Sequence, residues 1–344
     1  MVVTDKIPFI SESLIEEYER LTSEWLDGHS GYRPSDQGGK KVQGAFSCNL
    51  VYDLKSGSEF VGTDLPLAQV MGGFYFDTVL ENSQITLSND LLKFATIALL
   101  KGDTGSANSL WEFISAMGKG LTIEGDALKD VRATFDWICY NVRRSSCTNT
   151  ATDLTTLPTL TPNRLLFSDI TFRIATDFSD ALAATDKLTI SKFSLKLNNN
   201  LTDAEFGSPE NTGHTDAQLT LQPKRNGFRE VTFAITLPRY NADTWLDAQA
   251  GNSPVQADLK FTDGTYNFYI YLPNMNVTKV SAPIGGPGTF PMEVEFKCFR
   301  GAEYNSGAGN TVMKFQDATT KISEELAIET DNARAAGAVP DGDE

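Results

Sequence analysis

Few residues in this sequence could do metal or nucleophilic chemistry, and they are widely spaced. The two histidines, His29 and His214, lack the HxxxH or HExxH partner that places two imidazoles on one face of a zinc-binding helix. No CxxC pair occurs, so we interpret the cysteines as small buried apolar residues in a reducing compartment. The four cysteines are Cys48, Cys139, Cys147 and Cys298.

One acidic stretch has the residue types of a cation site. It contains Glu205, Glu210, His214 and Asp216. Their spacing matches no EF-hand loop, so a solvated acidic loop is the favoured interpretation. The sequence also lacks a GxSxG elbow, and its glycine-rich stretches "GNSPVQ" and "IGGPGTF" precede no helix with Lys-Ser or Lys-Thr. We predict that the protein is not an enzyme and has no catalytic, cofactor-binding or metal site.

The composition is that of a folded, acidic protein. Its 344 residues are 40% hydrophobic and carry a net charge of −16. A packed core is therefore expected, whereas general affinity for nucleic acid is not, because such affinity starts from a basic surface. The start, "MVVTDKIPF", does not resemble a signal peptide, and the apolar run "FATIALL" is too short to span a bilayer, so we expect no membrane anchoring.

Residues 10–26 have the pattern of an amphipathic helix. Ser13 and Glu16 fit a capping box, and Gly28 fits a helix end. We expect the apolar stripe of this helix either to pack on its own domain or to dock on a neighbouring subunit or ring. The stripe, and thus the candidate assembly contacts, consists of Leu14, Tyr18, Leu21 and Trp25.

Most of the remaining sequence predicts β-strands. Short alternating runs such as "KFSLKLN" and "MEVEFKC" are separated by Gly, Pro, Asn and Asp. Because no strand–helix–strand rhythm occurs, the pattern predicts antiparallel sandwiches or half-barrels. Near the end, residues 317–335 predict one helix, with Ile322, Leu326 and Ile328 available for docking, and the last ten residues predict a disordered acidic tail.

Two regions of the chain share the order and spacing of their predicted strands. Any two alternating strands can be aligned, but three matched pairs in order favour a duplication over chance. The second and third matched strands are separated by 38 residues in the first region and by 37 in the second. The first region also holds about 27 additional residues, within 54–90. The alignment places Val42 on Val231, Ile97 on Leu259 and Phe135 on Phe296.

These patterns predict a mainly β protein with two antiparallel β-sandwich or half-barrel domains, an N-terminal amphipathic helix and a C-terminal acidic tail. The predicted boundaries are 1–37 for the N-terminal arm, 38–163 and 164–302 for the two domains, and 303–344 for the C-terminal extension.

The second region resembles the tail tube proteins of long-tailed bacteriophages. The resemblance covers residues 165–301 through "KLTISKFSLKLNNNL", "PKRNGFREVTFAITLP" and "LPNMNVTKVS". The first region resembles the family more loosely, through "GGKKVQGAFSCNLVYD" and "KGLTIEGDALKDVRATFDW". The resemblance implies a structural subunit whose rings stack into a conduit for phage DNA. It implies a place in the virion tail, contacts with other tail proteins, and assembly in the host cytoplasm.

The number of chains in a ring depends on whether the chain is duplicated. Tubes built from single-domain subunits resemble sixfold rings, so two tube domains per chain predict a trimer with pseudo-sixfold symmetry, and one predicts a hexamer. The net charge further predicts an acidic lumen through which DNA passes without specific binding. The main alternative is a two-domain β-sandwich binding module, such as an adhesin or a capsid-decoration protein. A carbohydrate-active jelly roll is a second alternative, which requires a pair of neighbouring carboxylates.

Overall fold

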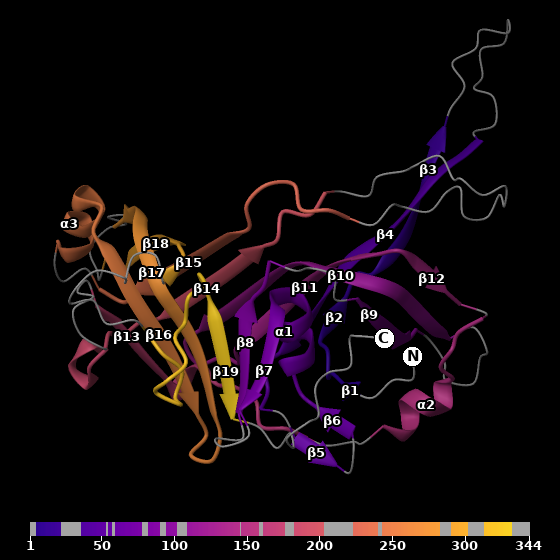
Figure 1. The fold of residues 1–344 in the computed structure, drawn as a ribbon, viewed down its shortest axis with the longest axis horizontal. Coiled ribbons are helices and arrows are strands. Elements are labelled where there is room, and N and C mark those ends of the chain that lie inside the picture. Colours follow the sequence, from indigo (N-terminus) through magenta and orange to yellow (C-terminus); the bar gives the residue numbers. More distant parts are fainter. Residues whose placement is uncertain are drawn as a thin grey trace, which may run out of the picture.

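Figure 1 shows the fold in a computed structural model of the chain. The structure describes residues 5–21, 36–52, 54–56, 59–77, 82–89, 94–101, 109–144, 146–157, 161–175, 182–202, 223–239, 243–282, 290–301 and 313–331.

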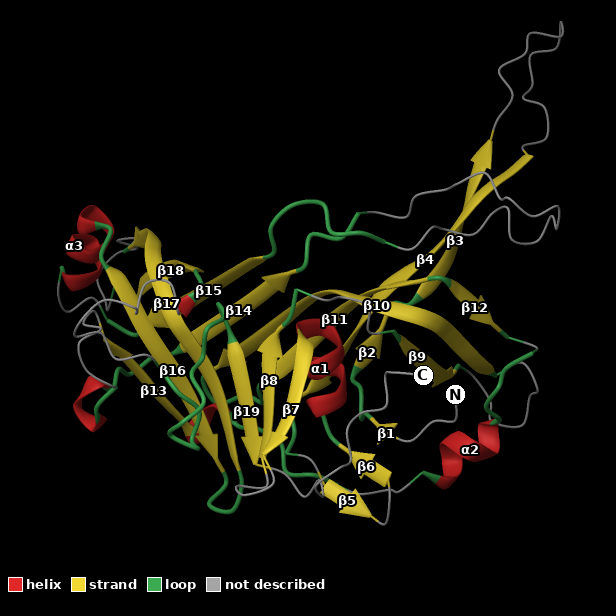
Figure 2. Cartoon of the chain, viewed as in Figure 1, coloured by secondary structure: helices red, strands yellow, loops and turns green. Residues whose placement is uncertain are grey.

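Strands make up most of the described chain (Figure 2). The strands are β1 (Asp5–Lys6), β2 (Ser11–Glu12), β3 (Ile15–Leu21), β4 (Asp36–Asn49), β5 (Leu54–Ser56), β6 (Glu59–Val61), β7 (Gly72–Asp77), β8 (Asn82–Leu87), β9 (Ala95–Leu100), β10 (Leu110–Asp126), β11 (Arg132–Cys139), β12 (Asn141–Arg143), β13 (Ile170–Ala175), β14 (Lys192–Asn198), β15 (Glu230–Leu237), β16 (Pro254–Thr262), β17 (Asn267–Ser281), β18 (Met292–Cys298) and β19 (Ala327–Asp331). The helices are α1 (Asp64–Met71), α2 (Ala151–Thr156) and α3 (Thr244–Gly251), with short 3-10 turns at Phe167–Asp169 and Ala184–Asp186.

One large antiparallel sheet runs through the molecule. Its main path is β2-β4-β11-β10-β14-β15-β18-β17-β19-β8-β7, with β3, β9, β12, β13 and β16 attached beside it. A small separate sheet contains β1, β6 and β5, and its β1–β6 pair is parallel. Strands such as β15 and β18 alternate between buried and more exposed residues, so one face of the sheet covers the core and the other is open. The expected mainly β, antiparallel fold is confirmed.

Two sets of four strands have the same order. In the first set β4 pairs with β11, β11 with β10, and β10 with β9; in the second β15 pairs with β18, β18 with β17, and β17 with β16. A helix follows the first strand of each set, α1 after β4 and α3 after β15. The pairings of the long strands β10 and β17 each contain two register irregularities, at Phe113/Ala116 and Gly118/Gly120 for β10, and at Val255/Ala257 of its partner β16 and Val277/Lys279 for β17.

The register of these pairs corrects one alignment made from sequence. Phe135 lies opposite Phe46 in the first set, and Phe296 lies opposite Phe233 in the second. Phe46 therefore corresponds to Phe233, which is two residues away from the alignment of Val42 with Val231. A shift of two residues keeps every side chain on the same face of its strand, so hydrophobic alternation alone cannot detect it.

The predicted N-terminal helix is wrong. Residues Ile15–Leu21 form β3, which pairs antiparallel with β4. The 14-residue β4 presents backbone groups along its whole edge, and a neighbouring strand can satisfy them whereas a helix cannot. Tertiary hydrogen bonding therefore outweighs a local helical pattern worth a few tenths of a kcal/mol per residue.

The predicted C-terminal helix is also wrong. Ala327–Asp331 form β19, which lies between β17 and β8 (Figure 1). The three apolar residues expected to dock, Ile322, Leu326 and Ile328, are buried. The predicted acidic tail at the end of the chain lies outside the described residues.

Candidate assembly interface

The C-terminal half of β17 is an open strand edge. Its partner β16 ends opposite Asn276, while β18 occupies the other side of β17 from Met275 to Ser281. Within the residues that the structure describes, no strand pairs with the second side of residues 277–281. The carbonyl of Thr278 accepts a hydrogen bond from the side-chain amide of Gln249 at 2.9 Å, so a side chain from α3 binds at this edge.

The second open edge is formed by β2 and β3, which pair with β4 and with no other strand in the described part of the chain. Ile10, Ile15 and Tyr18 are between 46% and 50% exposed there, a large exposure for apolar and aromatic side chains in one short segment. Leu14, between the two strands, is only 1% exposed and belongs to the core. In Figure 1 β17 and α3 lie at the left, whereas β2 lies near the middle and β3 extends to the upper right.

The chain crosses closely over Gly44 at this second edge. Gly44 has a φ of +151°, and a Cβ atom added to it would lie 2.7 Å from the Cα of Leu14. Only glycine adopts this conformation without strain and leaves room for the crossing. Gly44 therefore allows the N-terminal segment to reach the core through Leu14.

Two of the four sequence-predicted contact residues, Leu14 and Tyr18, do not share one exposed stripe. Leu14 is buried, Tyr18 is exposed, and Leu21 is the last residue of β3. Trp25 lies outside the described residues. Sequence reasoning missed the open edge of β17, because no residue type marks the unpaired side of a strand.

Two glutamates at the second edge are paired with cations. Glu16 forms ion pairs with Lys40 and Arg144, and its side chain is 4% exposed. Burial acts to raise the pKa of Glu16, but the hydrogen bonds from Lys40 and Tyr18, together with the charges of Lys40 and Arg144, outweigh it and lower the pKa. Hence Glu16 is ionised at neutral pH.

Glu12 forms a third ion pair at this edge. Its carboxylate is 2.8 Å from the Lys101 ammonium, which also donates to the carbonyl of Leu14 at 2.9 Å and lies 4.6 Å from the centre of the Trp111 ring. The Arg144 guanidinium lies 4.2 Å from the same ring. The three ion pairs and Trp111 thus form one charged cluster behind β2 and β3.

A third buried carboxylate lies where β19 joins the sheet. Glu329 is fully buried and accepts hydrogen bonds from Asn82, from the Tyr271 hydroxyl at 2.7 Å and from the Gln316 backbone. Burial raises the pKa of Glu329 to about 7, and these hydrogen bonds only partly offset the effect. Glu329 therefore changes charge near neutral pH while it ties β8, β17 and β19 together.

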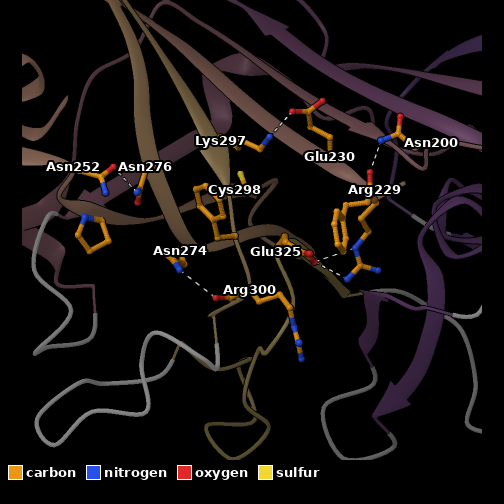
Figure 3. A pocket seen from close by; sticks show the side chains of 13 residues that line it. Asn200, Arg229, Glu230, Asn252, Asn274, Asn276, Lys297, Cys298, Arg300 and Glu325 are labelled. Carbon is orange, nitrogen blue, oxygen red and sulfur yellow. Dashed lines mark hydrogen bonds and ion pairs between the residues drawn. The ribbon is translucent and has the colours of Figure 1, made fainter. Parts of the chain in front are cut away.

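An open hollow of about 890 Å³ lies beside the ends of β15, β16 and β18 and the middle of β17 (Figure 3). Its polar side chains bind one another: Lys297 donates to Glu230 at 2.7 Å, and Arg229 donates to Glu325 at 2.6 Å. Cys298 in its wall is a buried thiol. The hollow thus has charged residues already engaged in ion pairs rather than a set of groups aimed at a substrate.

The described residues contain no group of three or more His, Cys, Asp and Glu that could hold a metal ion. His29, His214, Glu205, Glu210 and Asp216 lie outside that part of the chain. Of the four free cysteines three are buried, and burial raises the pKa of Cys48 and Cys139 to about 12. None of the described helices is long and apolar enough to cross a membrane.

Comparison with known protein families gives one match. The model of a family described as phage tail tube protein matches residues 3–298, which is most of the chain. No curated protein matches the sequence. The chain therefore belongs to the phage tail tube protein family, and the resemblance inferred from the strands and turns is confirmed.

Proposed function

We propose that this member of the phage tail tube family is the repeating subunit of a tail tube, in which rings stack around a lumen that conducts DNA. The observation that carries the proposal is the pair of open strand edges in one sheet, one at β2 and β3 and the other along the C-terminal half of β17. Exposed edges are an aggregation hazard in a monomer, whereas head-to-tail pairing between copies removes them and closes a ring.

We also propose that the chain is a duplicated tube domain. The two matching sets of four strands support this, as does the helix after the first strand of each set. The boundaries 38–163 and 164–302 each contain one set. The additional residues of the first region supply β7 and β8, which have no counterpart between α3 and β16.

Ring size follows from the duplication. If each chain supplies two sectors, three chains close a ring with pseudo-sixfold symmetry. The hexamer remains the alternative if only one region forms the wall. In either ring the open face of the sheet lines the lumen, because the opposite face is occupied by the core.

The acidic lumen expected from the net charge is proposed with one refinement. Lys192 and Lys196 of β14 are exposed on the open face. Two other lysines of this face are in ion pairs: Lys279 is 3.0 Å from Glu295, and Lys297 is 2.7 Å from Glu230. Each of these two lysines already has a carboxylate partner, which weakens its attraction for phosphate. DNA then passes without a continuous basic track to bind.

The edge formed by β2 and β3 is the proposed assembly contact. Tyr18 and Ile15 project from β3 with large exposed areas, and β3 extends with β4 away from the body of the molecule (Figure 2). Leu14 contributes indirectly, by anchoring the segment in the core. Leu21 and Trp25 continue the same segment and stay in the proposal. Contacts with other tail proteins and assembly in the host cytoplasm are proposed from family membership.

Electron microscopy of the purified protein tests this function. Stacked rings or tubes with a central channel are the expected result. A protein that stays monomeric over a range of concentrations and ionic strengths contradicts the proposal and favours the two-domain binding module.

A further inference from the structure

We infer that the open edge of β17 pairs with β2 and β3 of a second copy of this chain, on the plan of the seam that already joins β10 to β14 within one chain. The inference rests on the proposed function, since it names the surface through which the ring closes. The β10–β14 pairing from Gly120 to Asp126 is called the internal seam below.

The internal seam is apolar on its core face. Leu121 lies opposite Leu197, and Ile123 lies opposite Leu195, and all four side chains are buried. Asn199 ends the seam, because its buried side-chain amide donates at 2.9 Å to the carbonyls of both Gly118 and Val70. The seam is thus closed by packing and by the side-chain amide of the residue that follows β14.

The open edge of β17 corresponds to the β10 side of this seam. Leu121 lies opposite Phe135, and Val277 lies opposite the corresponding Phe296. Further along the two strands, the same comparison gives Val280 the position of Ile123 and Ser281 the position of Glu124. In β17 this side has no strand partner within the described residues.

The segment formed by β2 and β3 corresponds to the β14 side. Leu195 lies opposite Phe233, and Glu12 lies opposite the corresponding Phe46. Counting along the strand from Glu12 gives Leu14 the position of Leu197, Ser11 that of Ser194, and Glu16 that of Asn199. The register expected between two copies is therefore Leu14 opposite Val277, Glu12 opposite Val280 and Ser11 opposite Ser281.

The seam between copies differs from the internal seam in its chemistry. Glu12 and Glu16 stand where the internal seam has Leu195 and Asn199, and each has its own cations, Lys101 for Glu12 and Lys40 with Arg144 for Glu16. Ion pairs offset their desolvation only partly, so an ionic seam holds less tightly than an apolar seam of the same length. The seam between copies is therefore weaker than the internal seam. A ring should accordingly dissociate into intact chains before the internal seam opens.

Cysteine pairs test the register. Ser11→Cys with Ser281→Cys places two thiols directly opposite each other, at the Cβ separation of about 4.5–5.5 Å that neighbouring strands allow and close to the range of a disulfide. In the internal seam the corresponding Ser194 hydroxyl lies 3.3 Å from Glu124. Ile15→Cys with Ser281→Cys is the matched control, since Ile15 lies four residues, roughly 13 Å, along the strand.

The assembled variants are oxidised and run on a denaturing, non-reducing gel. We expect covalent dimers and trimers for the Ser11/Ser281 pair, at least tenfold more abundant than for the Ile15/Ser281 pair or for either single variant. Amide hydrogen exchange of wild-type protein is the second measurement, with protection of residues 276–281 expected to rise on assembly.

The outcomes separate the seam from the function. Rings that form without the Ser11/Ser281 cross-link, or with equal cross-linking in both pairs, overturn the seam and leave the tube function standing. The same holds if residues 276–281 exchange equally fast in rings and in free chains. If the wild-type protein forms no rings, the proposed function and the seam both fall.

Discussion

Glu329 shows how one buried side chain links the stability of this fold to pH. Its carboxyl group lies among Asn82, Tyr271 and Gln316, at the place where the last strand of the chain enters the sheet. The raised pKa, about 7 against an ordinary 4.5, means that the folded state holds a proton which the unfolded state has lost in this interval. The stabilisation contributed by Glu329 is therefore fully present below pH 4.5, and it is lost as the pH rises through about 7.

We predict that Glu329→Gln removes this pH dependence. Between pH 5 and pH 8 the wild-type free energy of unfolding should fall by up to about 3 kcal/mol from this group, since each pKa unit corresponds to about 1.4 kcal/mol. The amide stays neutral, so the variant should lose less stability over the same interval. Urea unfolding of both proteins at several pH values measures the difference. Parallel curves for the two proteins contradict the assignment.

Gly44 provides a second test at the scale of one residue. We predict that Gly44→Ala costs about 1–3 kcal/mol of stability locally, because alanine strains a φ of +151° and its Cβ meets Leu14 and Ser13. The N-terminal segment should then separate from β4, and rings should fail to form while the rest of the chain stays folded. Hydrogen exchange of residues 10–18 and electron microscopy measure both effects. Ala45→Gly, at the next position, is the control that should leave assembly unchanged.

At the scale of elements, the fold depends on a strand that comes from the end of the chain. β19 lies between β17 and β8, so it joins the second set of strands to the hairpin inserted in the first. The side chains of Ile322, Leu326 and Ile328 are buried and hold this segment against the sheet. The region 303–344 is therefore more than an appended extension, since residues 313–331 complete the sheet.

Truncation checks the role of β19. We predict that a chain ending at residue 312 aggregates or loses its cooperative unfolding transition, because it exposes the edges of β8 and β17 and leaves Tyr271 and Asn82 without Glu329. A chain ending at Asp331 is the matched control, and its melting temperature should stay within about 2 °C of the full chain. Equal stability of the two truncated chains contradicts this role.

At the scale of the whole molecule, the proposed duplication predicts the symmetry of the proposed tube. The hairpin formed by β7 and β8 belongs to the first set only, so adjacent sectors of a ring should differ. We predict three chains per ring and threefold, not sixfold, symmetry in images averaged from assembled tubes. Six chains per ring rule out the duplicated-sector arrangement, even though membership of the tail tube family stands.

Weak interaction with DNA is expected at the same scale. The net charge of −16 and the paired lysines of the open face predict that assembled tubes bind duplex DNA no more tightly than roughly 10⁻⁴ M at physiological salt, the weak end of non-specific binding. Fluorescence anisotropy of a labelled duplex titrated with tubes measures this. Micromolar affinity that falls steeply with salt would instead indicate a basic track along the lumen.

The sequence by itself determined the strand content, the matched intervals of the two regions and the family. Alternation with a period of two depends on neighbouring residues only, so the core faces of strands such as β14 and β18 are readable from "KFSLKLN" and "MEVEFKC". Tertiary structure decided what depends on distant partners. Residues 15–21 form a strand because they pair with the edge of β4. Residues 327–331 form a strand because they pair with β17 on one side and with β8 on the other. The register of β4 against β11 and the open side of β17 were likewise set by backbone hydrogen bonds between segments far apart in the chain, which leave no local mark on residue types.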